Sequence, residues 1–400
     1  MTAVPATPAL ASFSRRGWVQ SPTWDGFWMF SAIWGGALLL LASLAAPIMP
    51  WVIGLLVLQR GLSVLHSWST TWMVMGSPLL ADVRRSNRVK FAIVPAALVS
   101  LGLGLGLYTG VAQRYPDDGG FSWSLWPWGL YLLLFWVGHF WHFGNQDFGV
   151  LTIYRAKAGQ DRLADRRVDK LYTVAMMFLI QPVVYVGLID STAFSELVRT
   201  VLPFIPSIGS EAATVAVALA TLLTLGCVGF ELSKPNRSLP KLLYIFVIFL
   251  HPVLLWGATE TQNRTIAYAY VMAYLWSHWF IAIALVGRIN TGFYRGRGDT
   301  PWLALLRHGA VLGAIVGVVL ILTERHKDYL LFNTPEFQYK ELLASITPEQ
   351  GLIIGGILGF FLAEQLLHYW CDRCLFRFRD PRVRARVAPL LLGESLEGGR

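Results

Sequence analysis

Charged residues are scarce in this chain. Only 14% of its 400 residues are Asp, Glu, Lys or Arg, whereas about 25% is typical of a soluble globular protein. Hydrophobic residues make up 55%, and the mean hydropathy is +0.51. So few charges cannot cover the surface of a soluble protein of this size, and the same figures exclude a disordered, collagen-like or coiled-coil chain. The composition therefore indicates a polytopic membrane protein.

Cysteine is scarce as well. The three cysteines, Cys227, Cys371 and Cys374, are an odd number and fall within apolar segments, which argues against a disulfide framework. Cys371 and Cys374 have the spacing of metal ligands, but no second pair exists to complete a four-cysteine zinc site. Walker loops, dinucleotide fingerprints, serine nucleophile elbows and haem c motifs are also missing.

Apolar runs long enough to cross a bilayer are what the chain has in abundance. About ten occur, and proline falls at or between several of them, where helices end. We therefore expect an all-α, polytopic helical bundle of about ten transmembrane helices. The expected spans are 27–46, 51–76, 91–112, 125–150, 171–189, 212–230, 241–259, 265–287, 303–323 and 351–371.

The basic residues give this bundle an orientation. If ten helices cross the membrane, both termini and the even-numbered connections share one side, and that side carries 26 of the 33 Lys and Arg residues, against six on the other. This alternation is the positive-inside pattern. It predicts a cytoplasmic N-terminal segment 1–26, a transmembrane domain 27–371 and a basic cytoplasmic tail 372–400. The net charge of +9 is then a signal of topology, and we expect no nucleic-acid partner.

Six of the eight histidines fall within the expected spans. Ionisable residues in a bilayer are costly, face the bundle interior and mark functional sites. Counted from the cytoplasmic ends of their helices, five of them lie about eight to eleven residues deep, in one layer, with His368 nearer the surface. We therefore predict that these five form a metal site: His66, His139, His142, His251 and His278.

Other polar residues are expected to support the metal ligands or to contact a substrate. A ligating histidine usually donates its second ring N–H to a carboxylate or an amide. Glu364, His368 and Asp372 are spaced at four-residue intervals and so share one face of a helix. The residues that we assign to such supporting or substrate contacts are Asp147, Gln146, Asn145, Arg60, Glu364 and His368.

One stretch resembles a known family. The segment Gly138-His-Phe-Trp-His-Phe-Gly-Asn-Gln-Asp147 is similar to a motif of the Brp/Blh-type β-carotene dioxygenases, in which His-Phe-Gly is followed by an acid. The resemblance implies an integral membrane enzyme that holds iron with histidines from several helices. His66, His251 and His278 would be its further ligands. A second motif of the family, Pro-His-Gly, is not matched, because Leu65-His66-Ser67 stands there; the family's substrate is therefore not carried over.

Three functions are compatible with the sequence. The first is an intramembrane metal oxygenase, with non-haem iron as cofactor, that acts on a lipophilic small molecule entering from the bilayer. The second is a haem-binding or quinone-linked electron-transfer subunit, because two facing histidines suit axial ligation. The third is a proton-coupled transporter. All three imply contact with membrane lipids and a bacterial-type inner membrane, with any partner subunit unidentified.

Overall fold

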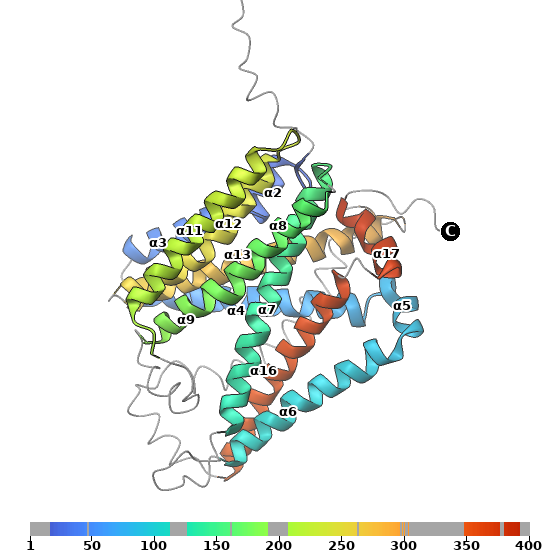
Figure 1. Ribbon diagram of the computed structural model, residues 1–400. Helices are drawn as coiled ribbons and strands as arrows, with labels where there is room; N and C mark the ends of the chain where they lie inside the picture. Colours follow the sequence, from blue (N-terminus) through green and yellow to red (C-terminus); the bar gives the residue numbers. More distant parts are fainter. Residues whose placement is uncertain are drawn as a thin grey trace, which may run out of the picture.

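The computed structural model shows a helical bundle (Figure 1). It describes residues 17–45, 48–112, 126–160, 162–190, 207–261, 264–296, 298, 300, 303, 348–376 and 380–392. Within these residues the regular structure is entirely helical, as the sequence predicts. The first part of the bundle consists of α2 (Pro22–Trp28), α3 (Ser31–Ala45), α4 (Ile48–Met75), η2 (Pro78–Leu80), α5 (Ala81–Ser86), η3 (Val89–Ile93), α6 (Val94–Ala112) and α7 (Trp126–Lys157). The second part consists of α8 (Leu163–Val174), η5 (Ala175–Ile180), α9 (Gln181–Asp190), α11 (Ser210–Leu232), α12 (Leu239–Glu260), α13 (Arg264–Arg295), α16 (Pro348–Leu375) and α17 (Pro381–Leu392).

Fewer helices qualify as membrane spans than the sequence predicted. By length and hydropathy, six helices of the described chain could cross a bilayer, or seven if the pair α2 and α3, bent by 50°, forms one span. The expectation of about ten is therefore not met by the described residues. Two further predicted spans, 51–76 and 125–150, coincide with α4 and α7, which are not among the six. The predicted span 303–323 lies outside the described residues, apart from residue 303. The long apolar helices indicate a multi-pass membrane protein.

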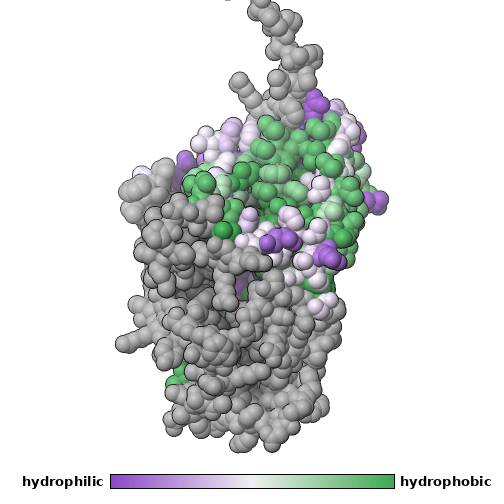
Figure 2. All heavy atoms as spheres, turned by 90° about the vertical axis from the view of Figure 1, so that its left-hand side faces the viewer, coloured by the Kyte–Doolittle hydropathy of each residue, from purple (hydrophilic) through white to green (hydrophobic). Residues whose placement is uncertain are grey.

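The outer surface agrees with that conclusion. On α11, for example, Val215, Leu222 and Leu225 are each about three-fifths exposed. Figure 2 shows one such face, where hydrophobic residues form a broad area and hydrophilic residues lie mostly along its margins. A soluble protein seldom leaves so large an apolar area in water, whereas lipid covers it at no cost.

Helix α16 is placed by its contact with α6. A Cβ atom added at Gly106 would overlap the backbone of Gly359, and one added at Gly102 would overlap the backbone of Ala363. Small residues at such a crossing let two backbones approach closely, as is common between helices in membranes. This contact brings α16 alongside α6 over much of its length (Figure 1), and it fixes the position of the polar residues that α16 carries.

An ion-pair cluster joins α7, α8, α11 and α12 at one end of the bundle. Asp169 of α8 pairs with Arg155 of α7 and with Lys241 of α12, each at 2.8 Å. Lys234 pairs at 2.8 Å with both Asp165 and Glu231. Burial alone would lower the pKa of Lys234, but these two carboxylates outweigh it and raise the pKa above its usual value. Buried charges are stable only when paired in this way.

Helix α17 lies in the predicted basic tail and is packed against the bundle. Its inner face buries Val383, Val387 and Leu391. At its C-terminal end, where carbonyls lack partners within the helix, Arg288 donates to the carbonyl of Leu391 at 2.9 Å.

Candidate metal centre

Four histidines from four helices meet inside the bundle. They are His66 of α4, His142 of α7, His278 of α13 and His368 of α16, and none is more than 4% exposed. The Nε2 atoms form a continuous series: His66 to His368 at 2.9 Å, His368 to His142 at 3.2 Å, and His142 to His278 at 2.9 Å. The rings of His66 and His278, at the two ends of this series, have centroids 4.6 Å apart.

Hydrogen bonding among the imidazoles cannot account for all three contacts. Each Nε2 carries either one hydrogen or one lone pair in the plane of the ring, so it serves one well-aligned hydrogen bond. The Nε2 atoms of His142 and His368 would each have to serve two. At most two linear hydrogen bonds can therefore form among these four atoms. A cation that accepts the lone pair of every Nε2 satisfies all four at once.

The spacing of the nitrogens agrees with metal coordination. Histidine binds zinc and similar ions through bonds of about 2.0–2.1 Å, so neighbouring ligand nitrogens at tetrahedral or right angles lie about 2.8–3.4 Å apart. The three observed separations, from 2.9 to 3.2 Å, fall within that range. The structure therefore contains a buried group of side chains that could hold a metal ion.

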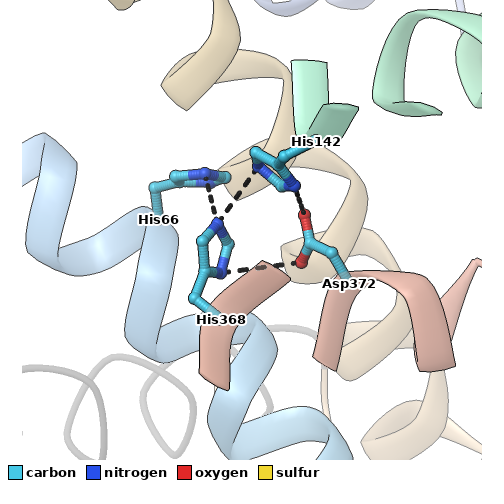
Figure 3. Close-up of side chains that lie close together, drawn as sticks. All are labelled: His66, His142, His368 and Asp372. Carbon is cyan, nitrogen blue, oxygen red and sulfur yellow. Dashed lines mark hydrogen bonds and ion pairs between the residues drawn. The ribbon is translucent and has the colours of Figure 1, made fainter. Parts of the chain in front are cut away.

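A carboxylate lies behind two of these imidazoles (Figure 3). Asp372 Oδ2 is 3.5 Å from His142 Nδ1, and Asp372 Oδ1 is 3.8 Å from His368 Nδ1. Single atoms of His66, His142, His368 and Asp372 can be chosen that all lie within 4.8 Å of one another. A carboxylate on the Nδ1 side favours the tautomer with hydrogen on Nδ1, which leaves the Nε2 lone pair for a metal. Asp372 thus suits a positioning role, or that of a further ligand.

Aromatic rings hold two of the imidazoles in place. Phe143 stacks on His278 with centroids 3.6 Å apart and an interplanar angle of 12°. Tyr369 stacks on His142 at 4.8 Å and 29°. These rings restrict the orientation of the two histidines and surround them with apolar atoms, which excludes water and lowers the local dielectric constant.

His251 was predicted as a ligand but lies in a neighbouring polar group. Its Nε2 is 2.9 Å from Ser277 Oγ, and its Nδ1 faces Asp147 Oδ2 at 3.7 Å. Asp147 also accepts a hydrogen bond of 2.7 Å from the Tyr244 hydroxyl. Asp147, which we expected to support the ligands, therefore serves His251 and Tyr244 in the structure.

His139 is also directed elsewhere. Its Nε2 lies 2.9 Å from the hydroxyl of Tyr274, which in turn donates to Gln181 Oε1 at 3.2 Å. Although His139 and His142 share one face of α7, three residues of helical rotation are enough to separate them: His142 reaches the four-histidine cluster and His139 does not. The predicted five-histidine set is thus divided, with His66, His142 and His278 together and His139 and His251 apart.

The remaining predicted residues have varied positions. Gln146 supports the centre indirectly, because its Nε2 donates to the backbone carbonyl of His278 at 3.0 Å. Asn145 is exposed and donates to the carbonyl of Trp141 in its own helix. Glu364 contacts the neighbouring Gln365. The side chain of Arg60 lies outside the described residues.

Two residues of the cluster, His368 and Asp372, have more direct positions than we expected from the sequence. His368 was assigned a supporting role because it lay nearer the membrane surface in the count from the helix end, yet it is central to the Nε2 series. Asp372 was not among the predicted site residues. The signal that could have identified it is its spacing of four residues from His368, which places both on one face of α16.

Comparisons with known proteins give no family for this chain. No family model matches it, and no match is found among the curated proteins or the solved structures. The fold and the cluster alone define its class, a multi-pass membrane protein with a buried histidine and aspartate group that could bind a metal.

Proposed function

We propose that the protein is an intramembrane oxygenase whose non-haem iron is held by His66, His142, His278 and His368. One observation carries the proposal: the Nε2 atoms of these four residues, from four helices, follow one another at 2.9–3.2 Å. Bonds to a shared ion account for all three separations, whereas hydrogen bonds account for at most two. Asp372 would orient two of the ligands, and Phe143 and Tyr369 would keep the centre dry.

The type of ligand is compatible with iron, and the local resemblance favours iron over other metals. Neutral imidazoles suit iron, zinc and copper, and the segment Gly138–Asp147 is similar to that of an iron-dependent family. Four imidazoles leave positions open on an octahedral ion. An iron ion in such a site supplies the means to bind and activate O₂.

The geometry supports a single ion over haem. Two axial imidazoles lie on opposite faces of a porphyrin, so their nitrogens are about 4 Å apart, twice a metal–nitrogen bond of about 2.0 Å. The Nε2 separations within the cluster are 2.9–3.2 Å, which leaves no space for a macrocycle between any of these pairs.

The position of the cluster favours a lipophilic substrate. The four histidines are buried among long apolar helices, so a small apolar molecule dissolved in the bilayer reaches them with a smaller loss of solvation than a charged one. We also propose the orientation that the basic residues indicate, with both termini cytoplasmic in a bacterial-type inner membrane. In agreement with it, the start of α8, helix α5 and helix α17 lie toward the top and right of Figure 1, and the end of α6 and the starts of α7 and α16 lie at the bottom.

Labelling with ¹⁸O₂ tests whether the protein is an oxygenase. Cells that produce the protein are grown under ¹⁸O₂, and their lipid extract is compared by mass spectrometry with that of cells producing His142→Ala. The proposal expects lipophilic products that carry ¹⁸O only with the unaltered protein, which should also purify with about one iron per chain and no Soret band. If the protein binds stoichiometric metal but gives no labelled products, the metal site stands and the oxygenase activity is rejected. If the protein holds no metal after reconstitution with Fe²⁺, both are rejected.

A further inference from the structure

Helix α8 has two polar faces of opposite charge. Its inner face carries Asp165 and Asp169, both buried in the ion-pair cluster. Its outer face carries Arg162, just before the first turn, followed by Arg166 and Lys170, and all three are exposed. Because they are spaced at four-residue intervals, they form one stripe about 12 Å long on the helix surface.

The stripe has no counter-charge in the described part of the chain. Both carboxylates of α8 point inward, where Arg155, Lys234 and Lys241 neutralise them, and no ion pair joins any of the three outer cations to an acid among the described residues. Like charges four residues apart on a helix repel one another. An external anion would remove that repulsion.

Apolar side chains lie next to the stripe. Leu163 and Leu171 are 59% and 69% exposed, and Leu179, on the continuation of the same helix in η5, is 65% exposed. The helix from Leu163 to Leu188 is one of the candidate membrane spans. The cations thus stand at the end of a span, at the level of lipid headgroups, and exposed leucines continue from them toward the bilayer core.

We propose that the outer face of α8 binds an anionic phospholipid. Arg162, Arg166 and Lys170 contact the phosphate of the headgroup, and the acyl chains lie along Leu171 and Leu179. Charge complementarity and the adjoining apolar surface together select this occupant, because a free anion would use the cations but not the leucines. The proposal stands apart from the chemistry of the metal centre.

The experiment uses the purified full-length protein and native mass spectrometry. The probes are phosphatidylglycerol and phosphatidylcholine with identical acyl chains, added at equal concentrations. The unaltered protein should retain phosphatidylglycerol preferentially. A triple variant, Arg162→Gln, Arg166→Gln and Lys170→Gln, should lose about two orders of magnitude of that preference, and Arg166→Gln alone about fivefold.

A matched control separates a site from a general effect of charge. The variant Arg85→Gln, Arg382→Gln and Arg384→Gln removes three other exposed cations and should keep the preference. Equal losses in both triple variants, or equal retention of the two lipids by the unaltered protein, would overturn the proposal. Displacement of the bound lipid by millimolar inorganic phosphate would also overturn it, since that would mean that the leucines contribute nothing. Thermal stability in phosphatidylcholine should be the same for all variants, so a folding defect is recognised directly.

Discussion

At the scale of single residues, the six histidines of the described spans differ in what their rings face, although His251 is as buried as the four cluster histidines. The Nε2 atoms of His66, His368, His142 and His278 follow one another at 2.9–3.2 Å. The Nε2 atoms of His139 and His251 instead lie beside the hydroxyls of Tyr274 and Ser277. Burial alone does not separate the two groups; the direction of the ring does.

The first prediction follows from this division. Replacement of any one of the four cluster histidines by Ala should reduce bound metal at least tenfold, because the remaining ligands share a weakened coordination set. His251→Ala and His139→Ala should retain it. The measurement is metal per chain by mass spectrometry after purification and equilibration with Fe²⁺. If His251→Ala lost as much bound metal as His142→Ala, the metal would lie elsewhere.

Asp372 provides a second prediction. Asp372→Asn removes the carboxylate behind His142 and His368, and metal affinity should fall by about 10–100-fold while the fold is retained, because the imidazoles lose the partner that fixes their tautomer. Glu364→Gln, two turns earlier on α16, is the control and should bind metal as the unaltered protein does. Affinity is measured by competition with a chromophoric chelator. Equal affinities for the two variants would contradict the positioning role.

Three of the four cluster histidines were among the predicted ligands. His251 was predicted in place of His368 for a geometric reason. Depth was counted from helix ends, which assumes parallel helices of known length. In the structure α16 is inclined to α7 (Figure 1), and it continues to Leu375, past its predicted end at residue 371. The count also contains no information on helix rotation, and it is rotation that turns His251 toward Ser277.

At the scale of helices, the close contact between α6 and α16 is the element on which the centre depends. Gly106→Ala would place a methyl group against the backbone of Gly359, which a change of side-chain rotamer cannot relieve. We expect a loss of about 3 kcal/mol or more in the free energy of unfolding and a parallel loss of metal, because α16 carries His368 and Asp372.

Gly104→Ala is the matched control for this prediction. It lies on the same helix, and a Cβ atom there would have no neighbour within 4 Å. Both variants are compared by thermal unfolding in detergent and by metal content. If Gly106→Ala is as stable as Gly104→Ala, the two helices are not in the contact described.

Helix existence was largely predictable from the apolar runs. Nine of the ten predicted runs coincide with helices of the described chain, because a run of about 20 apolar residues has no other way to satisfy its backbone in lipid. The number of spans was not predictable in the same way. In α7, which carries His142, the polar residues Asn145, Gln146 and Asp147 interrupt the predicted span.

At the scale of the whole molecule, the orientation in the membrane is open to direct test. The positive-inside pattern predicts that cysteines introduced at Asn87 and Ser233 react with a membrane-impermeant maleimide only from the cytoplasmic side, and one at Ser210 only from the opposite side. All three positions are exposed, and the native cysteines are buried, so background labelling should be low. Labelling of residues 210 and 233 from the same side would contradict the predicted orientation of α11.

X-ray absorption spectroscopy of the purified, iron-reconstituted protein reports directly on whether the four histidines bind one iron ion. We expect a nitrogen shell at about 2.0–2.2 Å, with the outer-shell scattering of about four imidazoles. In His142→Ala and His368→Ala the bound iron should be lost or the imidazole scattering should decrease, whereas in His251→Ala it should stay the same. A shell with one imidazole or none, or a spectrum that changes equally in all three variants, would contradict a metal centre built from His66, His142, His278 and His368.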